Sequence, residues 1–316
     1  MFRKFFLLVL CVLFVIPQSF AAELLTLVPN DAGLVIRANI KQLVSIPEIK
    51  KNIEDLSKQQ GKEYFEQVKN MGFDPLNDIY SLVAFMSLDN IQNQDAANAN
   101  VAFIANGKFD IDKIIEAIKT NKVTSEKVKF GEEDGFRTIT YSDDKQNSSK
   151  MLFIDNETVV IGTELGVSNV KAVKLTKKGG ILTRKDFSVA VTKLNANATL
   201  AATIALPDEA RKYLSTNEQT KPLDTIKFLS LDLTKLTDLD INLTGDFDAS
   251  AKMADVEKCL KTFIDMLKAN KAPYEALNEL AQNMKIVVHS NSATVSSTVS
   301  KAALDKLFET QKPQTK

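Results

Sequence analysis

The chain has 316 residues with 40 basic and 40 acidic side chains, one histidine and no tryptophan. This balance argues against a nucleic-acid-binding protein, which needs a concentrated basic face. The lack of tryptophan argues against carbohydrate sites built on indole rings.

The chain begins with a basic stretch, then an apolar run over residues 5–16, then the small residues Ser19 and Ala21 before a plausible cleavage site. This order is typical of a secretory signal peptide, and the apolar run is short for a membrane span. We expect residues 1–21 to be removed and the protein to be secreted, in the periplasm of a bacterium. An uncleaved membrane anchor is the alternative. Beyond residue 21 we expect no transmembrane span.

Strand and helix patterns alternate through the first half of the remaining chain. Runs of β-branched and apolar residues predict strands, isoleucines at helical spacing predict a helix over 111–118, and turn residues predict two hairpins. The polar stretch 89–100 is interpreted as a loop. The predicted elements are strands 33–40, 80–88 and 101–107, the helix 111–118, hairpins 126–141 and 150–163, and helices 165–175 and 184–194.

After residue 195 the same order begins again. PLNDI (75–79) precedes the strand 80–88, and PLDTI (222–226) precedes another predicted strand. GKFD (107–110) precedes the helix 111–118, and GDFD (245–248) precedes a second long amphipathic helix. Two short matches in one order indicate a duplication. The alternative is that both halves share only common turn chemistry, in which Pro and Asp precede strands and Asp caps helices.

We therefore predict an α+β fold with two similar halves, each a mainly antiparallel sheet with helices packed on one face. The first half should carry an additional hairpin. The predicted boundaries are a signal peptide over 1–21, a first repeat over 22–195, a second repeat over 196–309, and a disordered tail over 310–316.

Several segments resemble a diffuse set of secreted bacterial proteins of uncharacterised function. They are LLTLVPNDAGLVIRANI from residue 24, GFDPLNDI at 72–79, and GKFD at 107–110. The resemblance covers about half of the chain, and its motifs are structural. It implies an exported α+β protein and supplies no catalytic residue.

The residues that commonly carry catalysis do not form a recognisable pattern. The histidine, His289, ends a predicted strand and is interpreted as a surface side chain. Ser168 lacks the second glycine of a nucleophile elbow. Cys259 is the one cysteine outside the signal peptide, and it is interpreted as a small buried side chain, so no intrachain disulfide is expected.

Acidic residues also fit structural roles better than chemical ones. Asp238, Asp240 and Asn242 alternate with apolar residues, which favours a half-buried strand over a calcium site. Asp110 and Asp248 are interpreted as helix caps. No phosphate-binding or dinucleotide-binding loop is present. The sequence predicts no catalytic, cofactor-binding or metal site.

One basic stretch, residues 171–185, contains no acidic residue. A solvated surface is the simpler interpretation, and contact with anionic lipid head groups or an acidic envelope polymer is the functional one. Its members are Lys171, Lys174, Lys177, Lys178, Arg184 and Lys185.

The resulting hypothesis is an exported, non-enzymatic envelope protein that binds an unknown envelope protein or ligand. One alternative is a carrier of an apolar or lipid ligand between sheet and helices. Another is a hydrolase with an unrecognised site.

Overall fold

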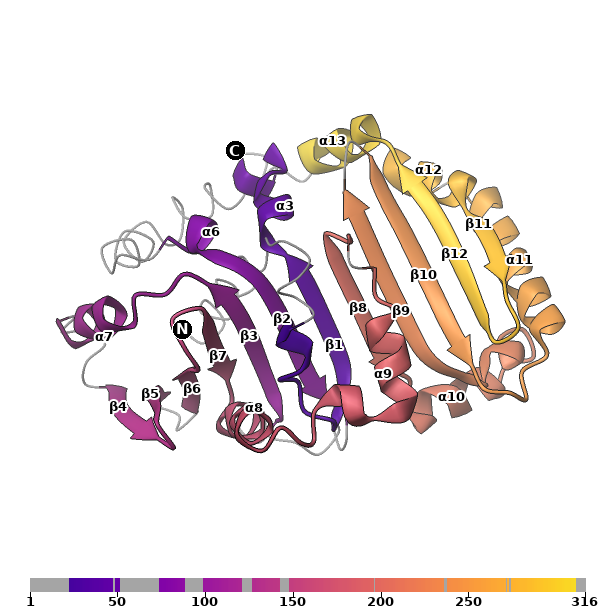
Figure 1. Cartoon of the computed structure of the whole chain (residues 1–316). Helices are drawn as coiled ribbons and strands as arrows, with labels where there is room; N and C mark the ends of the chain where they lie inside the picture. The colour runs from indigo at the N-terminus through magenta and orange to yellow at the C-terminus, as the bar shows by residue number, and fades with distance from the viewer. Residues whose placement is uncertain are drawn as a thin grey trace. The chain divides into compact units, whose positions relative to one another are not determined.

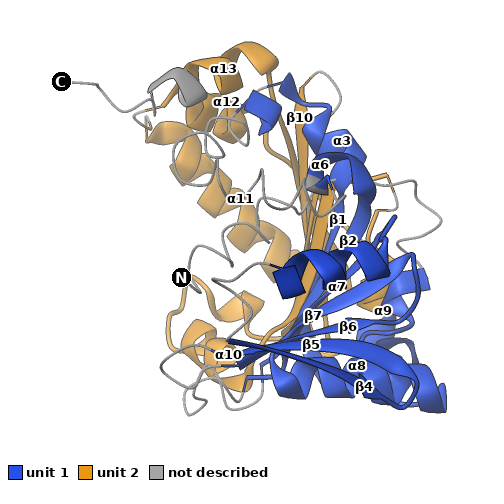
Figure 2. Ribbon diagram, turned by 90° about the vertical axis from the view of Figure 1, so that its left-hand side faces the viewer, with its two compact units in different colours: residues 1–188 blue, residues 189–316 orange. Residues whose placement is uncertain are grey.

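The structure is a computed structural model, and its strands and helices are shown in Figure 1. It describes residues 23–47, 49–51, 74–88, 99–120, 127–142, 148–195, 197–235, 238–270, 272 and 274–310. The predicted signal peptide, most of the predicted loop 89–100 and all but one residue of the predicted tail lie outside these residues. The chain divides into two units, residues 1–188 and 189–316, coloured separately in Figure 2. We refer to them as unit 1 and unit 2.

Unit 1 contains an antiparallel sheet in the order β1-β2-β3-β7-β6-β5-β4. The strands are β1 (Ala32–Asn39), β2 (Ile79–Ser87), β3 (Val101–Gly107), β4 (Val128–Glu133), β5 (Phe136–Ser142), β6 (Ser148–Phe153) and β7 (Thr158–Gly162). The helices are α3 (Ile40–Val44), α6 (Pro75–Asp78), α7 (Ile111–Thr120) and α8 (Glu164–Thr176), and a 3-10 turn, η2 (Ile181–Thr183), follows α8. The predicted α+β class and the antiparallel pairing are confirmed.

Helices pack on both faces of the sheet of unit 1. Lys150 of β6 reaches Glu164 of α8, while the next residue, Met151, packs against the same core cluster as the isoleucines of α7. Because successive side chains of a strand point to opposite faces, α7 and α8 cover opposite faces of the sheet. The prediction of helices on one face is wrong for this unit. Helix α8 covers its face of the sheet with buried side chains that include Val167 and Val170.

Unit 2 contains an antiparallel sheet in the order β8-β9-β10-β12-β11. The strands are β8 (Leu200–Ala205), β9 (Ile226–Lys235), β10 (Leu239–Phe247), β11 (Lys285–Val288) and β12 (Ser292–Val299). The helices are α10 (Asp208–Ser215), α11 (Met253–Ala269), α12 (Glu275–Asn283) and α13 (Lys301–Thr310), and a 3-10 turn, η3 (Lys221–Leu223), precedes β9. Helices α11, α12 and α13 lie on one side of these strands (Figure 2). Helix α9 (Lys185–Thr192) crosses the division between the units.

The two units use the same strand order. In each unit, the first three strands pair in chain order. A hairpin later in the chain then adds to the sheet, and the second strand of that hairpin pairs with the third strand of the sheet. These pairings are β3 with β7 and β10 with β12. The hairpin β4–β5 extends the edge of the sheet in unit 1, as the sequence predicted.

The segments PLNDI and GKFD meet each other inside unit 1. A Cβ atom placed on Gly107 would lie 2.2 Å from the carbonyl oxygen of Asp78 and 3.0 Å from Cζ of Phe109. The backbone N–H of Phe109 donates to the carbonyl oxygen of Asn156, in the β6–β7 turn, at 2.9 Å. The motif GKFD therefore packs against the end of PLNDI.

The corresponding segments of unit 2 meet in a similar way. A Cβ atom on Gly245 would lie 2.9 Å from Cδ1 of Ile226 and 3.1 Å from Cε2 of Phe247. The N–H of Phe247 donates to the carbonyl oxygen of Asn291, in the β11–β12 turn, at 2.8 Å. In both units glycine allows the close approach because any side chain would enter occupied space.

The predicted aspartate caps have different outcomes. Asp110 precedes α7 and accepts from the N–H of Lys113 at 3.2 Å, which confirms a helix cap. Asp248 accepts from the N–H of Ser250 at 2.8 Å, and α11 begins only at Met253. Its role as a cap of α11 is wrong, because the aspartate closes a local turn instead.

Candidate functional site

The six basic residues of the predicted anionic contact lie in unit 1, on α8 and on the segment after it. The structure divides them into two that bind neighbouring carboxylates and four that form no ion pair among the described residues. The first group is Lys171 and Arg184, and the second is Lys174, Lys177, Lys178 and Lys185.

Lys171 is held by the turn between β4 and β5. Its Nζ lies 2.8 Å from Asp134 and 3.0 Å from Glu133, and 18% of the side chain is exposed. The hydrogen bond to Asp134, followed in importance by the one to Glu133, raises the pKa of Lys171 above its usual value. This lysine therefore ties α8 to the hairpin.

The sequence did not reveal the centre of this network, Lys150. Its side chain is only 4% exposed, and its Nζ lies 2.5 Å from Glu133 and 2.7 Å from Glu164. Burial acts to lower the pKa of Lys150, but the hydrogen bonds to both carboxylates outweigh it and raise the pKa. The hydrogen bonds from Lys150 and Lys171 lower the pKa of Glu133. The sequence did contain a signal for this buried lysine. Lys150 and Leu152 are two residues apart in a strand and therefore share a face, and Leu152 is fully buried.

Arg184 is also used within unit 1. Its Nε lies 3.2 Å from Asp186, and its Nη1 donates to the carbonyl oxygen of Ala32 at 3.1 Å. The guanidinium carbon lies 5.1 Å from the centre of the Phe187 ring. Arg184 thus joins the segment after α8 to the start of β1.

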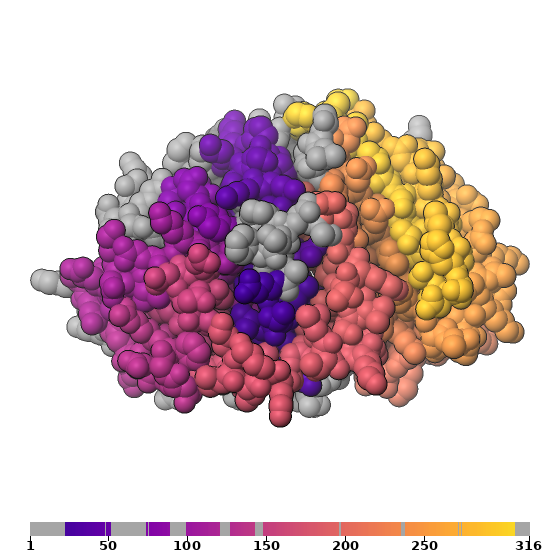
Figure 3. Space-filling view, viewed as in Figure 1, coloured from indigo at the N-terminus to yellow at the C-terminus, as the bar shows by residue number. Residues whose placement is uncertain are grey.

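The other four lysines are turned outward. Lys177, Lys178 and Lys185 are exposed, and Lys174 is half-buried. Lys177 ends α8 in the left-handed conformation, with φ of 57°, and its N–H donates to Val173. The next turn packs beside the N-terminal residues, where the N–H of Asn30 donates to the carbonyl oxygen of Gly179 at 2.8 Å. Figure 3 shows this segment at the surface, beside the indigo N-terminal residues.

The candidate catalytic residues occupy structural positions. His289 is exposed in the β11–β12 turn, where its N–H donates to the carbonyl oxygen of Ser292. Ser168 lies in the second turn of α8 and not at the strand-to-helix turn that a nucleophile elbow needs. Cys259 is half-buried, its thiol donates to the carbonyl oxygen of Gln219, and burial raises its pKa, which lowers its reactivity.

In the described part of the chain, no cluster of three or more His, Cys, Asp or Glu side chains could hold a metal ion. No helix there has the length and apolar character needed to cross a membrane. Asp240 and Asn242 lie on β10, and the alternate residues Leu239 and Ile241 pack against α12 and α13. The half-buried strand is confirmed.

An apolar row crosses the sheet of unit 2 on its helix side. Leu243 of β10 pairs with Leu231 and Val295, Leu231 pairs with Ala202, and Val295 pairs with Ile286. Leu243 has the same alternation as Leu239 and Ile241, so this row faces the side of the sheet that carries the helices. We call Ile286, Val295, Leu243, Leu231 and Ala202 the apolar row.

The apolar row lies between two filled parts of the core. Along the strands, one core cluster lies on each side of the row. On one side Phe247 and Ala293 pack with Val256 of α11, and on the other side Val299 packs with Ala276 of α12. Leu243 itself remains 39% exposed, and the other four members are half-buried.

Helix α11 leaves further apolar surface open. It packs on β11, β12, α12 and the 3-10 turn η3, and Phe263 and Met266 in its C-terminal half are 53% and 49% exposed. The sequence predicts a long amphipathic helix here, but Phe263 does not lie on its buried face. The helix is long enough to bury Val256 and Ile264 while other apolar side chains meet solvent.

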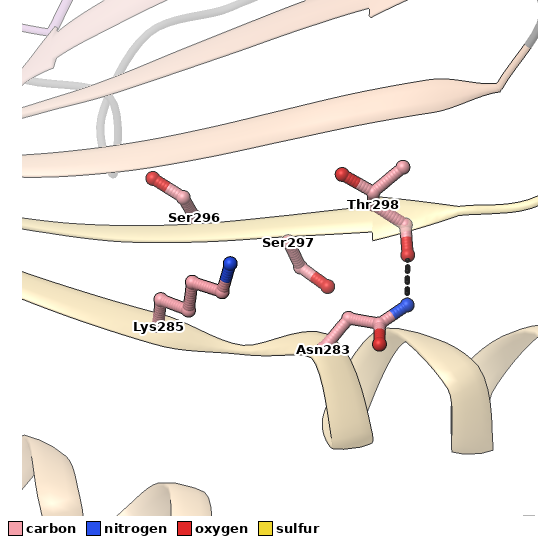
Figure 4. A pocket seen from close by; sticks show the side chains of 5 residues that line it. All are labelled: Asn283, Lys285, Ser296, Ser297 and Thr298. Carbon is pink, nitrogen blue, oxygen red and sulfur yellow. Dashed lines mark hydrogen bonds between the residues drawn. The ribbon is translucent and has the colours of Figure 1, made fainter.

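A polar hollow of about 370 Å³ lies where β11 begins, and Figure 4 shows the side chains that line it. The amide nitrogen of Asn283 donates to the carbonyl oxygen of Thr298 at 2.7 Å, which is the dashed line in Figure 4. The hydroxyl of Ser297 donates to the carbonyl oxygen of Leu280 at 2.7 Å. These bonds join the end of α12 to β12, so this hollow is primarily a packing junction. Lys285 and Ser296 complete its lining.

Comparison with protein-family models, with curated proteins and with solved structures finds no match to this chain. The functional argument therefore depends on the residues described above.

Proposed function

We propose that this chain is an exported, non-enzymatic binding protein and that the apolar row of unit 2 holds an apolar ligand, such as an acyl chain of a lipid. The observation that carries this proposal is the exposure of Leu243 in the middle of a sheet, between two filled core clusters. Fully burying an exposed leucine gains about 1.5–3 kcal/mol. Because Leu243 is 39% exposed and the other members of the row are half-buried, each side chain would contribute part of that amount.

Unit 1 supports this interpretation through contrast. Ala105 stands two residues before Gly107, as Leu243 stands two residues before Gly245. Ala105 pairs with Leu82 and Val159, and all three are buried in the core beneath α7. The corresponding position of unit 2 carries a larger side chain and remains more exposed.

The contrast depends on a second proposal, that the two units are copies of one ancestral unit. Its support is the shared strand order, together with the matching contacts around Gly107 and Gly245. Both units also place a Phe N–H on an Asn carbonyl in the last hairpin turn. Common turn chemistry alone does not require these tertiary contacts to agree.

The lipid-carrier alternative thereby becomes the preferred form of the binding hypothesis. The hydrolase alternative has less support, since His289, Ser168 and Cys259 each have a structural position that fits them. The ligand is expected to contact unit 2 through side chains and to undergo no covalent change.

A ligand-binding experiment tests the proposal. Native mass spectrometry of protein purified from its own envelope should reveal a bound apolar compound. A fluorescent fatty acid should bind the purified protein, and Leu243→Lys should weaken this binding at least tenfold, because a charge would occupy the row.

Leu277→Lys is the matched control, since Leu277 of α12 is 43% exposed and lies outside the row. It should leave fatty-acid binding unchanged. No bound compound and equal binding by both variants would refute the apolar-ligand proposal. The duplication has a separate test. In an experimental structure, residues 24–175 and 198–308 should superpose as the same order of strands and helices, and failure to superpose would refute the duplication.

A further inference from the structure

The segment after α8 combines two kinds of exposed side chain. Leu175 is 50% exposed and Leu182 is 39% exposed, and the exposed lysines Lys177 and Lys178 lie between them in the chain. Lys185 is exposed shortly after Leu182. Exposed leucines among lysines are the combination that surface-bound membrane proteins use, in which apolar side chains enter the bilayer and lysines meet anionic head groups.

We propose that residues 174–185 form a membrane-docking surface that binds a bilayer containing anionic lipids. This inference concerns unit 1 and does not depend on the apolar row of unit 2.

Buried residues on either side determine which way the segment faces. Val173, Gly180 and Ile181 are buried, and the N–H of Ile181 donates to the carbonyl oxygen of Val28 at 2.7 Å. Phe187 anchors the far end and is fully buried. Since the buried residues fix the segment to the unit, the exposed leucines and lysines between them project outward.

The electrostatics of the segment favour an anionic partner. No acidic residue occurs from 171 to 185. Asp186 is paired with Arg184. Asp31 accepts from the neutral side-chain amide of Asn100 at 2.6 Å and keeps its charge, but it forms no ion pair with any of the four lysines among the described residues. Lys174 and the three exposed lysines form no ion pair among the described residues, so all four can contact an external anionic partner.

The structure also identifies which basic residues should not contribute. Lys171 is bound by Glu133 and Asp134 and Arg184 by Asp186, so both are compensated internally. The sequence alone could not separate them from the other four.

Vesicle co-sedimentation of the purified protein tests the proposal. Binding to vesicles that contain phosphatidylglycerol should exceed binding to phosphatidylcholine vesicles and should weaken at high salt. Lys178→Gln with Lys185→Gln should reduce the partition coefficient about 25-fold, since each lysine near an anionic surface contributes roughly fivefold. Leu175→Ser with Leu182→Ser should also reduce it, by about tenfold or more.

Two control variants exclude nonspecific effects. Lys252→Gln with Lys258→Gln removes the same charge from exposed positions on unit 2 and should change the partition coefficient by less than about twofold. Leu277→Ser removes an equally exposed leucine and should also have little effect.

Three results would overturn the proposal. The first is equal binding to both kinds of vesicle. The second is an equal loss of binding in the lysine variant and its control, which would mean that only net charge matters. The third is binding that ignores the leucine substitutions while soluble polyglutamate competes fully, which would identify an acidic polymer as the partner.

Discussion

The network around Lys150 makes a quantitative prediction about stability. The Lys150 side chain is 4% exposed, while the side chains of its partners Glu133 and Glu164 are 37% and 53% exposed. The two sides of the interaction therefore respond differently when one of them is removed. Removing the carboxylates leaves a buried positive charge without a partner. Removing the amine leaves Glu164 exposed to water and Glu133 still paired with Lys171.

Lys150→Met keeps the length of the aliphatic side chain and removes the charge. The lost hydrogen bonds are offset by the desolvation that the amine no longer suffers, so we expect a cost of about 1 kcal/mol in the free energy of unfolding. Glu133→Gln with Glu164→Gln leaves the ammonium without a countercharge, and we expect a cost of about 3–5 kcal/mol.

Urea unfolding followed by circular dichroism measures both costs, through the transition that reports unit 1. Adding Lys150→Met to the double carboxylate variant should restore most of the lost stability, because the stranded charge is then gone. If the carboxylate variant costs no more than Lys150→Met, or if the triple variant is the least stable, the reasoning from asymmetric burial is wrong.

Three further predictions concern stability. Gly107→Ala should lower the free energy of unfolding by about 2–3 kcal/mol, because the new Cβ meets a backbone carbonyl. Gly245→Ala should lower it by about 1 kcal/mol, because its new Cβ meets side chains that can move. Equal costs in thermal melts would contradict this difference. Lys177→Gly should raise the free energy of unfolding by about 0.5–1 kcal/mol, since φ is 57° there, and calorimetry showing a loss would contradict it. The pKa of Glu133 is lowered below its ordinary 4.5, so its contribution to stability is present above pH 4.5 and is lost as the pH falls through the folded-state pKa. Glu133→Gln should therefore flatten the acid limb of a stability–pH profile, and an unchanged limb would count against the network.

Local periodicity was enough to predict most of the strands and helices. Ile111, Ile114, Ile115 and Ile118 predicted α7, and all four pack against the core of unit 1. Their spacing matches one face of a helix, and this property depends on no distant residue. The turn residues predicted the β4–β5 and β6–β7 hairpins, and this signal is local as well.

Properties set by tertiary packing could not be predicted. Nothing in the sequence indicated that Leu243 would be exposed while Ile241 would be half-buried against α12 and α13, because both occupy the same face of one strand. The difference depends on where α11 and α12 cross the sheet. The partition of the basic residues had the same origin, since Lys171 finds Asp134 only after the β4–β5 hairpin is placed beside α8.

The strand order has a consequence for how the chain folds. Nearly all pairings within each unit join strands that follow one another in the sequence, and the exceptions are β3 with β7 and β10 with β12. Residue 103 pairs with residue 161, and residue 243 pairs with residue 295. Closing these long loops costs more chain entropy than forming a hairpin, so we expect them to limit the folding rate. Substitutions at Phe103 or Ile161 should therefore slow folding, whereas changes in the β4–β5 hairpin should mainly speed unfolding.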